Sequence, residues 1–234
     1  MSISRRAALA AAVSVVFTIA APAAFAQFGG IKVPGLSGGG SSGQSNVDVD
    51  GLLNQQTGLM KRFNGALNNM LAAEARTLRA LGFKAEADKA DAEARYYESG
   101  NVMDKSQIER SVAVSEENKK LIDQKAVEGG LLTAEGKKEL AAAVPHYVRG
   151  MTEGAQLPPE FSKWANSLQS GVSSLSGNPT QAMKLKDGAA PGIYVAQNVP
   201  TLVSKWGQTT KNFTAFAKKN DVDVGNLDNV AAKF

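Results

Sequence analysis

The chain contains no cysteine and only one histidine among its 234 residues. Without cysteine it can form no disulfide bond, no thiolate nucleophile and no iron–sulfur or cysteine-ligated zinc site. The single histidine, His146, cannot form a site of several histidine ligands, and no carboxylate lies three or four positions from it. These absences exclude most metal and redox chemistry, so the sequence predicts no cofactor and no metal.

Motifs for phosphate, dinucleotide and acyl-transfer chemistry are also absent. The chain has neither a Gly-x-x-x-x-Gly-Lys-Ser/Thr loop nor a dinucleotide glycine motif between a strand and a helix. It has no Gly-x-Ser-x-Gly nucleophile elbow. No catalytic residue can be named, and the chain is predicted not to be an enzyme. An enzyme that uses Asp and Glu alone stays open, because such residues carry no signature without a fold.

The charge balance gives no reason to expect a nucleic acid partner. The chain has 26 Lys and Arg against 22 Asp and Glu, a formal net charge of +4. Removal of residues 1–26, which contain Arg5 and Arg6 and no acid, lowers this net charge to +2. A nearly balanced chain lacks the basic surface that DNA and RNA binding requires.

The one long apolar run lies at the start of the chain. Arg5 and Arg6 precede an uncharged stretch over residues 7–21, and Ala24-Phe25-Ala26 follows. A basic head, a short apolar middle and an A-x-A exit are typical of a secretory signal peptide, and the middle is too short for a transmembrane helix. Cleavage is expected after Ala26, giving an exported, periplasmic or secreted protein without a stable membrane span.

Two export routes stay open, and a linker follows the signal. The segment from Ser4 to Leu9 is similar to the twin-arginine motif, although Ala8 replaces its usual bulky residue. The general secretory route is the alternative, in which the two arginines only form the positive head. Residues 27–47 are rich in Gly and Ser, which predicts a disordered, flexible linker before a helical domain over residues 48–234.

Apolar residues recur at steps of three and four along the rest of the chain, and no strand pattern is long enough to be convincing. The fold class is therefore all-α, a single bundle of five or six main helices. Gly82 and Gly129-Gly130 are predicted stops, while Thr133 and a Ser106–Glu109 capping box are predicted starts. The expected helices cover residues 50–81, 84–98, 106–128, 134–151, 157–172 and 200–217, with short turns at 178–185 and 193–198. Residues 221–234 are expected to form a solvated tail with one final turn.

Pro145 is predicted to break the fourth helix. Proline removes a backbone donor and leaves the carbonyl of Ala141 without its usual partner. Tyr147 continues the apolar stripe, so the break is expected near the core, with His146 or a water molecule as the new partner of that carbonyl. A tolerated kink and a pocket-lining role for His146 and Tyr147 are both open.

The few aromatic residues allow two interpretations. Trp164, Trp206 and Phe213 fall at helical spacing, which is typical of core packing. They could also line an apolar pocket within the bundle. Together with His146 and Tyr147 they are the candidate ligand-binding residues.

Four short sequence segments resemble segments of exported all-helical proteins of proteobacteria. They are Met103-Asp104-Lys105, Val112-Ala113-Val114-Ser115-Glu116-Glu117, Pro145-His146-Tyr147-Val148-Arg149-Gly150 and Tyr194-Val195-Ala196-Gln197-Asn198-Val199-Pro200. The resemblance implies export and a helical fold, and it carries no activity and no site residue.

Two functions are consistent with these features. The first is a non-enzymatic binding or scaffolding protein that acts through its surface on a protein partner. The alternative is a carrier of a small apolar molecule or lipid in a pocket of the bundle. The sequence does not indicate an oligomeric state.

Overall fold

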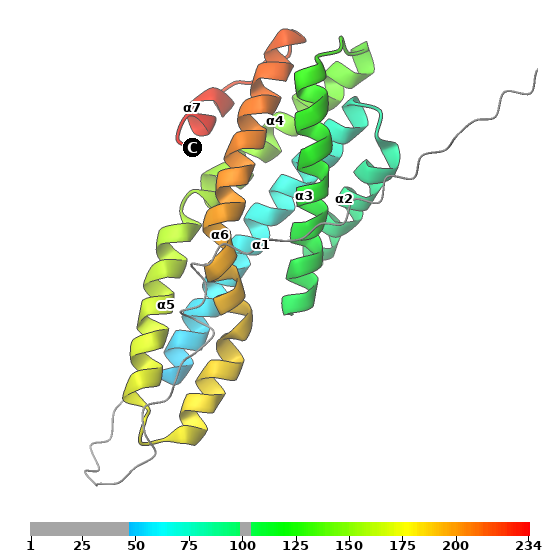
Figure 1. Ribbon diagram of the computed structural model, residues 1–234. Helices are drawn as coiled ribbons and strands as arrows, with labels where there is room; N and C mark the ends of the chain where they lie inside the picture. The colour runs from blue at the N-terminus through cyan, green and yellow to red at the C-terminus, as the bar shows by residue number, and fades with distance from the viewer. Residues whose placement is uncertain (1–46, 99–103) are drawn as a thin grey trace, which may run out of the picture. The chain divides into compact units, whose positions relative to one another are not determined.

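The computed structural model describes residues 47–98 and 104–234, and every regular element in these residues is a helix (Figure 1). The predicted all-α fold is confirmed. Along the described residues the helices are α1 (Val49–Ala80), α2 (Lys84–Glu98), α3 (Lys105–Glu128), α4 (Ala134–Gly154), α5 (Leu157–Ser174), α6 (Pro179–Lys219) and α7 (Leu227–Ala231). The predicted signal peptide (1–26) and the predicted linker (27–47) lie outside the described residues, apart from Val47.

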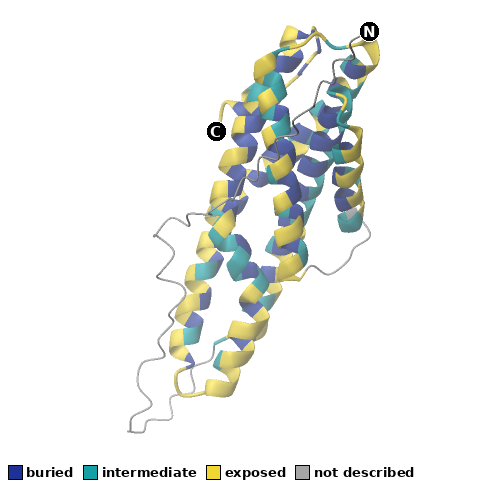
Figure 2. Ribbon diagram, turned by 45° about the vertical axis from the view of Figure 1, so that its right-hand side comes forward, coloured by how far each residue is buried: buried dark blue, intermediate teal, exposed yellow. Residues whose placement is uncertain are grey.

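Helix α1 is the central element of the bundle. It begins after Asp48, whose side chain accepts a hydrogen bond from the backbone N–H of Gly51 at 2.7 Å. Its most extensive contacts are with α4 and α2, and it also contacts α3, α5 and α6. The main apolar core, which includes Phe63, Leu67 and Met70 of α1, extends through the helices around it (Figure 2), and a small second cluster contains Leu78, Ala87 and Ile122.

A glycine lets α1 and α4 approach closely. A Cβ atom at Gly150 of α4 would lie 2.8 Å from the Sδ atom of Met70 and 3.2 Å from the carbonyl oxygen of Ala66. These distances are shorter than ordinary van der Waals contact, so no larger residue fits here without a shift of the helices.

The predicted helix ends are largely confirmed. Gly82 follows α1 with φ of 88°, and Gly129 ends α3 with φ of 67°, both in the left-handed region that favours glycine. Thr133 caps α4 by accepting a hydrogen bond from the N–H of Gly136 at 3.1 Å. The predicted Ser106 cap is wrong: the cap lies two residues earlier, at Asp104, whose side chain accepts from the N–H of Gln107.

Helix α6 corrects the prediction for the last third of the chain. Two short turns and a separate long helix were expected from Pro191 and Pro200, but α6 is continuous from Pro179 to Lys219 with both prolines inside it. Asp187, whose carbonyl loses its donor at Pro191, is exposed, and Ala196, whose carbonyl loses its donor at Pro200, is partly exposed. Water can therefore replace the missing helical hydrogen bonds.

The predicted break at Pro145 is also wrong. Helix α4 runs without interruption from Ala134 to Gly154. Both Pro145 and Ala141 are exposed, while Tyr147 is fully buried. The freed carbonyl of Ala141 thus belongs to the solvent face and not to the core, where water can hydrate it.

The C-terminal segment is less solvated than expected. A final turn is present as α7, but Val222, Val224, Leu227 and Val230 around it are buried in the main core. Helix α7 packs against α4 and α6, and it therefore covers part of the bundle.

Candidate functional site

The five residues predicted from sequence to bind a ligand do not form one pocket. Tyr147 and Phe213 stack at 4.5 Å between ring centroids, and both are fully buried. Trp206 is fully buried too, whereas Trp164 is 3% exposed and His146 is half-buried. Among these five residues, only Trp164 lines one of the two cavities considered below.

The two tryptophans lie at different levels of the bundle. The indole of Trp164 contacts α6 at Gly192, where a Cβ atom would lie 2.7 Å from its ring. Trp206 lies on α6 itself, 14 residues after Gly192, and this separation corresponds to about 21 Å along the helix axis. Both indole N–H groups have partners: that of Trp164 donates to the carbonyl of Leu52 at 3.0 Å, and that of Trp206 donates to Ser115 Oγ at 3.2 Å. These aromatic residues are packed and hydrogen-bonded parts of the core.

A buried carboxylate that the sequence analysis did not select lies where α1, α3 and α6 meet. Glu74 of α1 is fully buried. It accepts hydrogen bonds from Ser115 Oγ at 2.7 Å and from Asn118 Nδ2 at 3.1 Å. Because Ser115 in turn accepts from Trp206, one hydrogen-bonded chain connects the three helices.

Burial raises the pKa of Glu74 to about 8, because desolvation disfavours its charged form more than the donors of Ser115 and Asn118 favour it. Lys119 is buried beside this group, and its Nζ has no hydrogen-bond partner in the described residues. Desolvation lowers the pKa of Lys119, while the carboxylates of Glu74 and Glu116 oppose this shift. The interior therefore holds an acid whose pKa is raised by burial and a base whose pKa is lowered by burial.

Helix α3 is attached to its neighbours mainly through polar groups. Asp123 accepts from Asn212 Nδ2 of α6 at 2.9 Å and from Thr209 Oγ1 at 3.3 Å. Glu93 of α2 accepts from Ser111 Oγ at 2.7 Å and pairs with Arg110 Nε at 3.0 Å. Four of the seven buried residues of α3 are polar: Ser111, Ser115, Asn118 and Lys119. The network fixes the position of α3, and it opens into neither of the two cavities.

The sequence contains one signal for the burial of Glu74, namely its position within the apolar stripe of α1. Met70 and Leu78 lie four residues before and after it, so helical periodicity places Glu74 on the buried face of α1. A carboxylate at such a position requires buried partners. Those partners come from distant segments, which the sequence alone could not identify.

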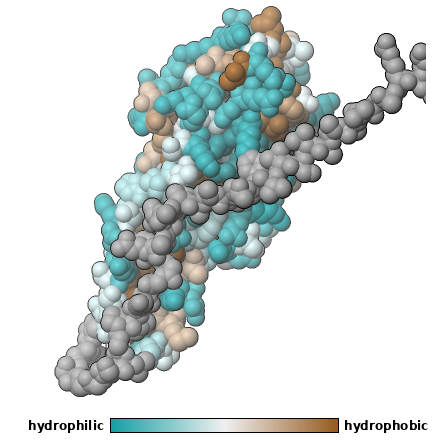
Figure 3. All heavy atoms as spheres, in the orientation of Figure 1, coloured by the Kyte–Doolittle hydropathy of each residue, from teal (hydrophilic) through white to brown (hydrophobic). Residues whose placement is uncertain are grey.

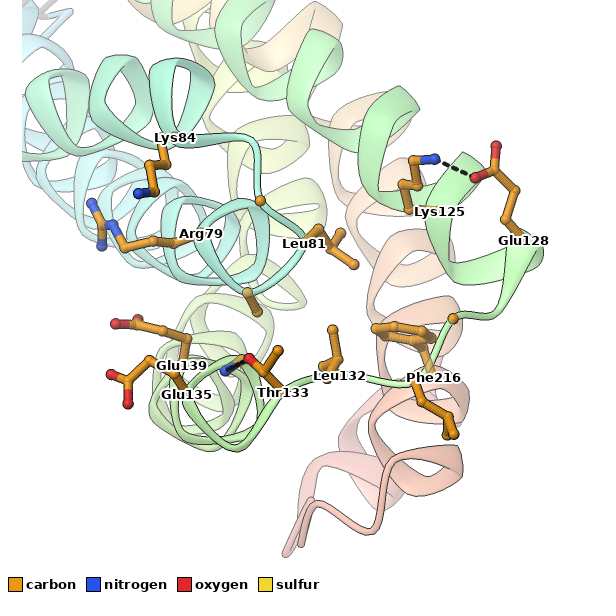
Figure 4. A pocket seen from close by; sticks show the side chains of 15 residues that line it. Arg79, Leu81, Lys84, Lys125, Glu128, Leu132, Thr133, Glu135, Glu139 and Phe216 are labelled. Carbon is orange, nitrogen blue, oxygen red and sulfur yellow. Dashed lines mark hydrogen bonds and ion pairs between the residues drawn. The ribbon is translucent and has the colours of Figure 1, made fainter.

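The larger cavity, about 650 Å³, lies at one end of the helices and is the best candidate for a binding site (Figure 4). We call it the end pocket. Its lining comes from the α1–α2 turn, from the end of α3, from the α3–α4 connection with the start of α4, and from Phe216 of α6. The side chains of Leu81 and Leu132 point into the space between these segments in Figure 4.

Apart from the Lys125–Glu128 ion pair of α3, the charged residues of the end pocket are separated by sign. Arg79 and Lys84 lie on the α1–α2 side, and Glu135 and Glu139 lie on the α4 side (Figure 4). Arg79 is held by Asp91 through a hydrogen bond that raises its pKa. Lys84 is exposed, and its ammonium group forms no ion pair within the described residues.

The rim of the end pocket has unusual apolar exposure. Val127 is 83% exposed and Leu131 is 84% exposed, and Leu131 also lines the pocket. The only other exposed large apolar residue of the described chain is Met183, which is 65% exposed at the start of α6. The visible face in Figure 3 is otherwise mostly hydrophilic, with small apolar areas. The end pocket therefore combines a cavity, two exposed apolar side chains and charges of both signs.

The smaller cavity, about 400 Å³, is a groove between α1 and α5. Leu59 and Trp164 supply its apolar surface, and Arg62 and Glu160 form an ion pair at its edge.

No group of three or more His, Asp or Glu residues that could hold a metal ion occurs in the described residues. In the same residues no helix is both long and apolar enough to cross a membrane.

No protein-family model matches the chain, and neither a curated protein nor a solved structure is significantly similar to it.

Proposed function

We propose that the chain is an exported, non-enzymatic binding or scaffolding protein that contacts a protein partner through the end pocket. The observation that carries this proposal is the exposure of Leu131, which lines a cavity of about 650 Å³, together with the exposure of Val127, the neighbour in sequence of the lining residue Glu128. Single exposed apolar residues are common, but two of them next to an open pocket are typical of an interaction site.

Packing of the core favours surface binding over the carrier alternative. Tyr147, Trp206 and Phe213 have no exposed surface, and they belong to the continuous core. A ligand enclosed among them would have to displace packed side chains. The carrier function retains one possible site, the groove beside Trp164.

Export is the second part of the proposal, and the pattern of residues 1–26 supports it. Peptide sequencing of material secreted by the native host should give Gln27 as the mature N-terminus. Replacing Arg5 and Arg6 by Lys distinguishes the two routes: twin-arginine export would stop, and general secretion would continue. Retention of the chain with residues 1–26 intact would contradict export.

The binding part can be tested by photo-crosslinking in the cell. A photoreactive amino acid in place of Leu131 should form a defined crosslinked adduct with a protein. The same amino acid in place of Met183 is the matched control, because Met183 is exposed but does not line the end pocket. Equal labelling from both positions, or none from Leu131, would contradict binding at the end pocket. A copurified lipid in native mass spectrometry would favour the carrier.

A further inference from the structure

The apolar rim and the cavity of the end pocket belong to one continuous segment. Val127 and Leu131 project at the end of α3 and in the α3–α4 connection, while Leu132 and Thr133 directly after them line the cavity. A projecting apolar group and a cavity therefore lie side by side on the same surface. In a two-fold contact the same patch faces itself, so each projection can meet the cavity of the other molecule.

The charges of the end pocket are suited to the same arrangement. Three cationic and three anionic side chains line it: Arg79, Lys84, Lys125, Glu128, Glu135 and Glu139. Two identical patches of one sign would repel each other, but this balanced patch does not. Lys125 and Glu128 form an ion pair on the α3 side, while Arg79 and Lys84 lie across the pocket from Glu135 and Glu139 (Figure 4). A two-fold rotation can therefore place Lys84 of one copy near Glu135 of the other.

We propose that the partner of the end pocket is a second copy of this chain, bound through a two-fold contact in which Leu131 of each copy enters the end pocket of the other. This inference rests on the proposed binding function of the same site. The pocket lining comprises 15 residues, and Val127 extends it. A standard stable interface has about 20–30 residues on each side, so the dimer should be weak and reversible.

Sedimentation velocity of the mature full chain at about 1 to 200 μM tests the proposal directly, a range chosen for weak association. The wild-type protein should pass from monomer to dimer within this range. Leu131→Asp should raise the dissociation constant of the dimer about tenfold or more. Each copy then contributes one buried charge to the contact, so the two-fold interface contains two. Leu131 is 84% exposed, so this substitution should not affect folding, which circular dichroism can check.

Met183→Asp is the matched control and should dimerise like the wild type, since Met183 is also exposed but lies outside the end pocket. Charge reversal provides a second test. Lys84→Glu and Glu135→Lys should each weaken the dimer, and the double variant should recover it, because exchanging both charges restores the opposite-charge pairs between the copies.

Two results would overturn the second copy as partner. One is a wild-type chain that stays monomeric over the whole concentration range. The other is equal weakening by Leu131→Asp and Met183→Asp. Crosslinking from Leu131 to a different protein, together with a monomeric chain, would preserve the proposed function and reject this inference. Absence of any crosslink from Leu131 would reject the proposed function itself.

Discussion

Replacement of Glu74 by Gln should remove a pH dependence from the stability of the bundle. Gln has nearly the same size and can still accept the hydrogen bond from Ser115. The amide of Asn118 can turn so that its oxygen accepts from the new NH₂ group. The variant therefore keeps the polar contact between α1 and α3 and loses only the titratable group.

The sign of the effect follows from the direction of the pKa shift. Burial raises the pKa of Glu74 from 4.5 to about 8, so the folded chain retains a proton that the unfolded chain releases between these values. The stabilisation from protonated Glu74 is complete below about pH 4.5 and is lost as the pH rises through about 8. From pH 5 to pH 7 the wild type should lose about 2–3 kcal/mol of unfolding free energy relative to Glu74→Gln.

Urea unfolding followed by tryptophan fluorescence at pH 5, 6 and 7 measures this difference. Glu135→Gln is a suitable control, because it removes an exposed carboxylate outside the network and should follow the wild-type pH dependence. Parallel curves for the wild type and Glu74→Gln would refute the reasoning, because Glu74 would then have the same pKa in both states.

Other substitutions test the packing, and urea unfolding followed by circular dichroism measures each of them. Gly150→Ala should destabilise the chain by about 1–3 kcal/mol, because its new Cβ would crowd Met70. Gly58→Ala, with no atom within 4 Å of its Cβ, should stabilise α1 by about 0.5–1 kcal/mol, and a loss there would contradict the assigned helix. Trp206→Phe removes the donor to Ser115 and should cost about 1–3 kcal/mol. Thr133→Ala should cost about 1 kcal/mol and Thr133→Ser much less, and equal losses would exclude the cap.

Helix boundaries could be predicted wherever a local signal determined them. The bounds of α2 and the end of α3 agree with the sequence prediction, because periodic apolar residues are followed there by a glycine or a short connection. Thr133 and the Leu157–Pro159 segment marked the starts of α4 and α5 for the same reason. Caps and stops act over three or four residues, so the sequence contains all the information that they need.

Local signals could not predict whether a helix continues through a proline. Pro145 and Pro200 interrupt the backbone hydrogen bonds of α4 and α6, and local propensity favours a break at both. Whether a helix continues depends on whether water reaches the freed carbonyl, and this depends on the face that the proline occupies. Pro145 is exposed and Tyr147 two residues later is buried, so the helix accommodates the proline on its solvent side.

The polar interface of α3 shows why the candidate site was only partly predictable. Amphipathic patterns identify which face of a helix is buried, but they assume that this face is apolar. Ser115, Asn118 and Lys119 are polar, yet all three are buried in the described fold. Their burial depends on Glu74, which lies 41 residues before Ser115 in the chain.

The end pocket was missed because three distant segments form it. The α1–α2 turn, the α3–α4 connection and Phe216 come together only in the folded bundle. One local signal was nevertheless present: Leu131 and Leu132 directly follow Gly129-Gly130, in a connection where apolar residues have no helix face to occupy. The fold buries part of Leu132 and leaves Leu131 84% exposed, so these adjacent residues have different environments. Exposing an apolar side chain to water is unfavourable, and a partner that covers Leu131 removes this cost. For this reason the oligomeric state of the Leu131→Asp variant is the most direct measurement of what the end pocket does.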